Sequence, residues 1–187
     1  MTTATQALET GAATWQIDPA HTTVEFGVKH LMISTVKGRF ADVEGSVTLE
    51  GDDATTARID VTIAAASIDT GVEQRDGHLR SADFLDAERF PSLRFRSTGV
   101  ERAGKDELRV SGDLTIRDVT REVVLHVEER GTAKDPWGGL RAGFAGTVKI
   151  DRKDFGLTWN QALETGGFLV GDTVKIAIDA ELVLQTE

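Results

Sequence analysis

Four histidines are the residues in this chain best suited to acid–base or metal chemistry: His21, His30, His78 and His126. No two of them have the i, i+2 or i, i+4 spacing that places two metal ligands on one face of a strand or helix. His126 lies on the polar face of an alternating segment, and His21 follows Asp18-Pro19-Ala20, where a hydrogen bond within a turn is the simpler role. The spacing therefore predicts no metal site. The chain has no cysteine, which excludes thiolate ligands, cysteine nucleophiles and disulfides.

Charged side chains gather in residues 73–88, which contain Arg75, Asp76, Arg80, Asp83, Asp86 and Glu88. An acidic residue near a helix start is favoured by the helix dipole, and a charged helix face is commonly a solvated one. The alternative is that Arg75 or Arg80 contacts an anionic headgroup such as phosphate. The chain contains no nucleophile elbow, zinc-protease motif or glycine-rich phosphate loop. No catalytic residue and no cofactor are predicted, and the chain is not expected to be an enzyme.

The composition of the chain narrows the classes of partner that it can bind. The 187 residues carry a formal net charge of −10, with a pI of about 4.9. This charge disfavours nucleic acid, and it disfavours anionic bilayers unless a local basic patch overrides it. No stretch reaches the roughly 18 apolar residues of a spanning helix, so no stable membrane insertion is expected. Residues 1–11 lack the basic and apolar regions of a secretory signal, which predicts a cytoplasmic protein. Residues 1–13 are predicted to form a flexible arm and residues 14–187 a single domain.

The elements that must position these residues are mostly strands. Apolar and polar residues alternate with period two, which indicates strands with one buried face, in runs at 24–28, 47–49, 59–63, 93–95, 108–116, 123–127, 144–150 and 174–184. Short turns at 103–106 and 134–139 favour antiparallel neighbours. The pattern predicts an all-β fold, an antiparallel barrel of about eight strands.

Two segments interrupt the alternation. Residues 73–88 carry apolar residues at helical spacing, which predicts one short helix that ends before Phe90-Pro91. Residues 152–171 form either a functional loop at a barrel mouth or a partly helical connector that seals one end. The string QALETG occurs at 6–11 and again at 161–166. Two helical fragments of one kind would explain it, but coincidence is the simpler interpretation.

A barrel of this size either fills its interior with side chains or holds one small ligand. Gly38, Gly112 and Gly146 lie on the inward faces, where they either leave space or mark bulges and corners. Strand parity, weighted toward aromatic residues, selects these candidates for the lining of a ligand tunnel: Phe26, Val28, His30, Phe40, Ile63, Phe84, Phe95, Leu114, Ile116, Phe144, Phe168 and Ile176.

Several of these motifs occur together in one family. Trp15-Gln16-Ile17-Asp18-Pro19-Ala20-His21-Thr22 resembles the W-x-I-D-x-x-H-S opening of YceI-like, polyisoprenoid-binding proteins. Residues 67–70 and 75–79 (SIDT and RDGHL) resemble the S-I-D-T-x-x-x-x-R-D-x-H-L block, and Arg152-x-Asp154-Phe155-Gly156 comes near the end. The resemblance runs from Trp15 to Leu184 with its blocks in order. Asp118 and Val123 depart from it, standing where the family usually has glycine and proline.

The resemblance implies a lipocalin-like, extended barrel with an apolar tunnel for a polyisoprenoid chain, such as an isoprenoid quinone or a prenyl phosphate. It also implies a homodimer, and it supplies no catalytic residues. Family members often carry a secretory leader and are periplasmic or secreted, unlike the location expected above. The resulting hypothesis is a lipid-binding protein that acts in carriage, storage or stress response. Two alternatives stay open: an enzyme acting on a lipid through His21, His30 or His78, and a filled barrel with a structural or interaction role.

Overall fold

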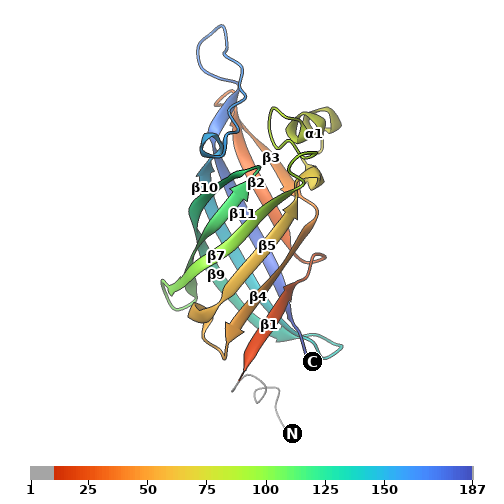
Figure 1. Ribbon diagram of the computed structural model, residues 1–187, viewed down its shortest axis with the longest axis vertical. Helices are drawn as coiled ribbons and strands as arrows, with labels where there is room; N and C mark the ends of the chain where they lie inside the picture. The colour runs from red at the N-terminus through yellow and green to blue at the C-terminus, as the bar shows by residue number, and fades with distance from the viewer. Residues whose placement is uncertain (1–10, 187) are drawn as a thin grey trace.

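The alternating segments form the wall of a closed antiparallel barrel in the computed structural model, which describes residues 11–186 (Figure 1). We call the barrel end at which β1 begins the lower end, and the end that carries the helix the upper end. The strands are β1 (Ala12–Ile17), β2 (Thr23–His30), β3 (Ser34–Phe40), β4 (Val43–Glu50), β5 (Arg58–Ala64), β6 (Ile68–Asp69), β7 (Ser92–Arg102), β8 (Glu107–Ile116), β9 (Val119–Lys134), β10 (Leu140–Asp151) and β11 (Val170–Leu184).

The eleven strands make eight lines around the barrel because three lines are interrupted. β1 pairs with β4 while β2 pairs with β3, and β4 and β3 pair in turn with β5 and β6. β1–β2, β3–β4 and β5–β6 are therefore each one line with a bend. The bend at Asp18 is a turn in which the carboxylate accepts the backbone N–H of Ala20. The predicted all-β barrel of about eight strands is confirmed.

Closure is made by β11, which pairs with β10 on one side and with both β2 and β1 on the other. All neighbours in the ring are antiparallel, and each long strand follows its neighbour in sequence, so the barrel is a meander. The ring closes where β1 meets β11, whereas residues 34–38 of β3 pair with β2 alone. Among residues 11–186, no helix has the length and apolar content that crossing a bilayer requires.

The upper end is covered by α1 (Glu73–Arg80) and the turns that follow it. The one short helix predicted near residues 73–88 is confirmed: it begins at Glu73, is eight residues long and ends at Arg80. Ser81 leaves the helix in an extended conformation and donates its hydroxyl to the carbonyl of His78. Asp86 then adopts a positive φ of 49°, which is incompatible with a continuing helix.

Short 3₁₀ helices complete the ends: η2 (Ala54–Thr56) at the lower end, η3 (Ala65–Ser67) between β5 and β6, and η4 (Arg152–Phe155) after β10. Residues 156–169, which we call the lobe, project beyond the upper end (Figure 1). The second QALETG copy lies in the lobe and forms an isolated bridge and a turn, not the helical fragment considered above. The first copy falls almost entirely outside the described residues. So does most of the predicted arm, and β1 begins at Ala12, inside its predicted bounds.

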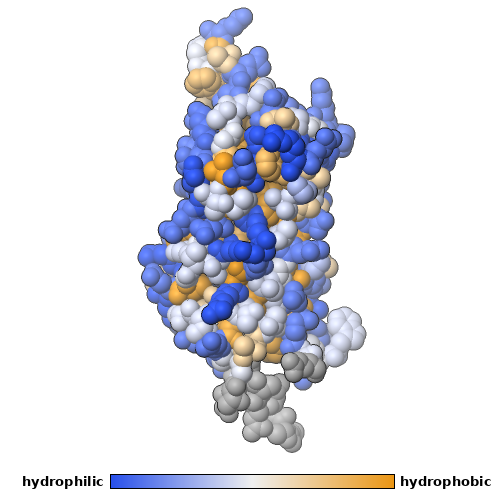
Figure 2. Space-filling model, viewed as in Figure 1, coloured by the Kyte–Doolittle hydropathy of each residue, from blue (hydrophilic) through white to orange (hydrophobic). Residues whose placement is uncertain are grey.

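The tightly buried residues form clusters at the two ends of the barrel. The upper cluster packs Phe84 and Leu85 from the turns after α1 against Phe155 and Leu157 from η4 and the lobe. The lower clusters centre on Trp15 and Val110. The visible outer face is largely hydrophilic, with scattered hydrophobic groups (Figure 2). The apolar stripe of each strand is thus directed inward, and the middle of the barrel contributes few fully buried side chains.

Candidate functional site: the barrel cavity

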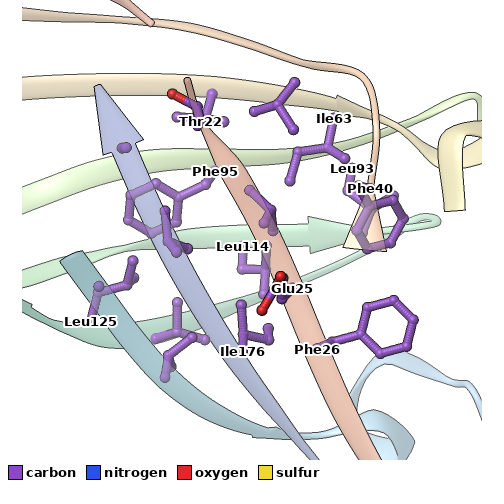
Figure 3. Close-up of a pocket in the computed structure, with 18 of the residues that line it drawn as sticks. Thr22, Glu25, Phe26, Phe40, Ile63, Leu93, Phe95, Leu114, Leu125 and Ile176 are labelled. Atoms are coloured by element: carbon purple, nitrogen blue, oxygen red, sulfur yellow. The ribbon is translucent and has the colours of Figure 1, made fainter. Parts of the chain in front are cut away.

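The interior between the two end clusters is an elongated apolar cavity of about 750 Å³. Its wall is formed by the inward-facing residues of every long strand, because side chains alternate across each strand. Figure 3 shows Phe26, Phe95, Leu114, Leu125 and Ile176 projecting into this space from neighbouring strands. A volume of this size falls within the range of about 300–1,000 Å³ seen for small-molecule sites. The sequence left open whether the barrel is filled or hollow, and the structure shows that it is hollow.

The structure brings nearly all of the predicted lining residues together around this cavity. They are Phe26, Val28, His30, Phe40, Ile63, Phe84, Phe95, Leu114, Ile116, Phe144 and Ile176. Phe168 is the exception: its side chain is 56% exposed, and it lies in the lobe, where no strand parity directs it inward. The prediction for Phe168 is therefore corrected.

The inward glycines serve two different purposes. A β-carbon at Gly38 would lie 2.4 Å from Cζ of Phe26, directly across on the neighbouring strand. A β-carbon at Gly112 would lie 2.4 Å from Cζ of Phe95. At these two positions the glycine accommodates an aromatic ring. Gly146 differs, because a β-carbon there would have its nearest neighbours, on Ile178 and Val127, at 3.7 and 3.8 Å, and the residue lines open cavity.

Arg75 places a guanidinium at the upper end of the cavity. Its Nε donates to Thr70 Oγ1 at 2.8 Å and its Nη2 to the Thr70 carbonyl at 3.1 Å. Thr70 is held in turn by Asp76, whose carboxylate accepts both the backbone N–H and the hydroxyl of Thr70. Asp76 is only 3% exposed, so this relay is rigid. The Nη1 group of Arg75 has no hydrogen-bond partner among residues 11–186 and is available to an anion.

Arg80, the other predicted headgroup residue, is placed differently. Its Nε and Nη2 donate to the carbonyls of Ala66 and Ile68, which ties α1 to the 65–69 segment. It is not among the residues that line the cavity. Helix geometry explains the difference, because residues 75 and 80 lie about 140° apart around the axis. Arg80 therefore has a structural role in place of the predicted headgroup contact, and Arg75 stays a candidate for that contact.

The histidines are dispersed. His30 and His78 line the cavity, whereas His21 lies in the exposed turn that follows β1. His78 contacts Asp83 through Nε2 at 2.8 Å and packs edge-on against Trp159, with ring centroids 4.6 Å apart. His30 makes no side-chain hydrogen bond within the described part of the chain. The cavity therefore contains one histidine–carboxylate contact, at its rim, and not the convergence of two histidines with a carboxylate that the enzyme alternative requires.

Arg152 is a cavity-lining residue that the parity argument missed. Its side chain is 4% exposed, and it donates to the carbonyls of Leu157, Trp159 and Gly171 at 2.7–2.8 Å. Burial lowers the pKa of its guanidinium. These bonds attach the first residues of the lobe and the start of β11 to η4. The signal in the sequence was the Arg152-x-Asp154-Phe155-Gly156 block, which marks a charged residue where strand alternation predicts none.

A second charged cluster lies on the outer wall. Arg141 donates to Asp18 at 2.7 Å, to Asp135 at 2.9 Å and to Glu181. Hydrogen bonds from His21 first, and then from Arg141, lower the pKa of Asp18 to about 2. Ligand atoms of Asp18, His21 and Glu181 lie within 4.8 Å of one another. The guanidinium of Arg141 hydrogen-bonds both Asp18 and Glu181, so the cluster links the turn after β1 to β10 and β11.

Fold and cavity together define a small-molecule-binding β-barrel, and comparison with known proteins gives its family. Residues 15–182 match the YceI-like domain, and the chain belongs to this family. Protein YceI of Salmonella newport is 42% identical over 149 residues, covering 79% of this chain and 78% of that protein.

Solved structures agree on the architecture. Burkholderia cenocepacia BcnA superposes with a TM-score of 0.77 at 24% identity, covering 88% of this chain and 98% of that one. A domain from Saccharophagus degradans, described as polyisoprenoid-binding and implicated in plant cell wall breakdown, superposes with a TM-score of 0.67 at 14% identity, covering 91% and 98%. At these sequence identities, the similarity establishes a shared fold and nothing further.

Proposed function

We propose that this protein binds one long apolar isoprenoid lipid inside the barrel and acts as a carrier or store, without transforming it. The observation that carries the proposal is the cavity itself: about 750 Å³, enclosed by inward-facing Val, Ile, Leu and Phe side chains from every long strand. Moving apolar surface out of water into such a cavity yields roughly 25 cal/mol per Å². The apolar lining includes residues from both ends of the barrel, which suits a chain ligand because each added unit contributes burial without a directional contact.

The ligand class rests on three supports. The family is YceI-like, a barrel of the same fold is described as polyisoprenoid-binding, and the cavity is apolar along its length. Isoprenoid quinones and prenyl phosphates are the candidate ligands. We place the polar end of the ligand at the upper end of the cavity, where the free Nη1 of Arg75 can donate to an oxygen. An anionic phosphate would gain more from this contact than a neutral quinone.

A binding role is favoured over catalysis by the arrangement of titratable groups. His78 contacts one carboxylate at the rim, and His30 contacts none in the described chain. The expected homodimer and the cytoplasmic location stay predictions. Light scattering on the purified protein measures the first, and fractionation of the native host measures the second.

Native mass spectrometry of protein purified from its own host, followed by organic extraction, tests the proposed ligand. We expect one apolar molecule of several isoprene units per chain. A ubiquinone and a polyprenyl phosphate of matched chain length, supplied in detergent, then rank the two classes. Protein that is isolated empty and takes up neither probe would contradict the proposal.

A further inference from the structure

The lysines of this protein are unevenly distributed. The chain has seven, and four of them project outward from the upper half of four consecutive strands, β3, β2, β11 and β10: Lys37, Lys29, Lys175 and Lys149. We call the outer surface of these strand halves the lysine wall. A fifth, Lys153, follows at once in η4 and pairs with Asp172 at 3.0 Å. A protein with a net charge of −10 thus carries a concentrated basic surface.

The register places three of these lysines in a single row across the sheet. Lys37 lies opposite Gly27, Gly27 opposite Lys175, and Lys175 opposite Lys149. None of the four wall lysines has a carboxylate within ion-pair distance in the part of the chain that the structure describes. Like charges directly opposite on neighbouring strands are destabilising. The lysines of this row form no ion pair, so an external anion would stabilise them.

The surface is also hollowed at this point. A shallow groove of about 820 Å³ runs over the outer faces of β9, β10 and β11. Its basic lining residues are Arg121, His126, Lys149 and Lys175, and its acidic ones are Glu122, Asp151 and Asp154. The lysine row crosses this groove, so anionic groups can approach Lys149 and Lys175 from outside the barrel.

The upper edge of the wall is apolar. In the three-residue β2–β3 turn, Leu31 and Met32 hold positive φ angles of 52° and 60°, a conformation that normally favours Asn or Gly. Met32 and Ile33 are 68% and 81% exposed. The Leu31 N–H donates to the Leu169 carbonyl at 2.9 Å, which joins this turn to the lobe and its exposed Phe168. Hydrophobic groups are visible on the lobe at the upper end (Figure 2).

We infer that the lysine wall and this apolar edge dock the protein on a bilayer that contains anionic lipid. The inference rests on the proposed function, because an isoprenoid lipid has to be collected from a membrane. Lysines near an anionic surface attract it, and exposed apolar side chains insert among the headgroups. The docking surface adjoins the cavity: His30, which follows Lys29 of the wall, and Leu169, which accepts the Leu31 N–H of the turn, both line the cavity.

Vesicle flotation tests the inference, using phosphatidylcholine vesicles with and without phosphatidylglycerol. We expect the full chain to float only with the anionic vesicles, and to be released by salt, since the Debye length falls from about 10 Å at 0.1 M to about 3 Å at 1 M. The double substitution Lys149→Gln/Lys175→Gln should weaken binding by about tenfold. The matched control, Lys105→Gln/Lys134→Gln, makes the same charge change at the lower end and should leave binding unchanged.

The apolar edge has its own pair of variants. Met32→Ser/Ile33→Ser should also weaken binding several-fold, whereas Trp137→Ser, which removes an 87% exposed side chain from the opposite end, should not. Wild-type protein that ignores anionic vesicles would overturn the inference. Control variants that lose as much vesicle binding as the wall variants would also overturn it. Wall variants that lose only self-association, measured by light scattering, would overturn it as well.

Uptake of the ubiquinone from detergent separates this inference from the proposed function. The wall and edge variants should take up the quinone like the wild type and lose only transfer from vesicles, because their substituted residues do not line the cavity. If neither the wild type nor the variants take up the quinone, but the wild type still floats with anionic vesicles, the ligand assignment fails and the docking surface stands.

Discussion

The ring of Phe95 on β7 lies over Gly112 on β8, so closely that a β-carbon on residue 112 would come within 2.4 Å of the ring. The same β-carbon would lie 2.5 Å from the carbonyl oxygen of Arg96, which is backbone and cannot move aside alone. Gly112 therefore lets an aromatic side chain of the cavity wall lie flat against the sheet. Phe26 and Gly38 repeat the arrangement on β2 and β3.

Gly112→Ala tests this relationship. We expect the substitution to lower the free energy of unfolding by about 1–3 kcal/mol, because the ring and the strand must both shift. Gly146→Ala is the matched control: its β-carbon meets only ordinary contacts, so stability should hold or rise slightly. Urea unfolding of the two variants measures the difference. Equal effects would show that the ring does not depend on a glycine beneath it.

A larger residue at Gly146 should block the cavity. Gly146→Leu directs a side chain between Val127 and Ile178 into the space proposed for the lipid. We expect the lipid recovered per chain to fall at least several-fold, while the barrel stays folded because it fills empty volume. Thr147→Leu adds similar bulk on the outer face of the same strand and should leave recovery unchanged. Extraction and mass spectrometry measure recovery, and circular dichroism verifies the fold. Full lipid recovery in Gly146→Leu would place the ligand elsewhere.

Removing the guanidinium of Arg75 should discriminate between headgroups. We expect Arg75→Gln to weaken binding of a polyprenyl phosphate by about tenfold, as loss of a charge-assisted hydrogen bond predicts, and to change quinone binding little. Arg80→Gln should instead lower the melting temperature, because Arg80 bonds the carbonyls of Ala66 and Ile68. Tryptophan fluorescence titration, which Trp159 near the cavity permits, measures both affinities. Equal losses for the two lipids in Arg75→Gln would contradict headgroup selection by Arg75.

The cluster around Asp18 predicts an acid-dependent part of the stability. Hydrogen bonds from His21 and Arg141 lower the pKa of Asp18 from 3.8 to about 2 in the folded state. The ionised carboxylate therefore stabilises the fold above the unfolded-state pKa, and this contribution is lost as the pH falls toward the folded-state pKa. Asp18→Asn should be less stable than wild type by about 1–2 kcal/mol at neutral pH, with the difference shrinking between about pH 4 and pH 2. Urea unfolding across this range measures it, and a difference that does not change with pH would contradict the assignment.

The local alternation of apolar and polar residues was sufficient to predict most strands of the barrel wall. The alternation in residues 174–184 predicted the inward face of β11, because each apolar residue has to point away from water, although the strand itself begins earlier, at Val170. The eight alternating runs correspond to the eight lines of the barrel. β3 was not predicted as a strand: its apolar residues are separated by Gly38, and the aromatic ring that covers this glycine comes from another strand.

Tertiary contacts decided the remaining parts of the site. Arg152 is buried because three backbone carbonyls converge on it, and strand alternation by itself does not indicate that. Arg75 and Arg80 are alike in sequence, yet only one faces the cavity, because the orientation of α1 depends on its packing over the upper end. Phe168 is aromatic like the lining residues but lies in a segment without strand periodicity.

The amino-acid sequence by itself determined the all-β class, the inward apolar faces and the membership in a family, since these follow from alternation and from motifs that can be recognised locally. Only the tertiary structure decided that the barrel is hollow, that Arg75 and not Arg80 borders the cavity, and that the lysines of four strands form one wall. The physical reason is register. Residues far apart in the chain become neighbours only when strand pairing sets their positions, and a shift of one residue would reverse every face.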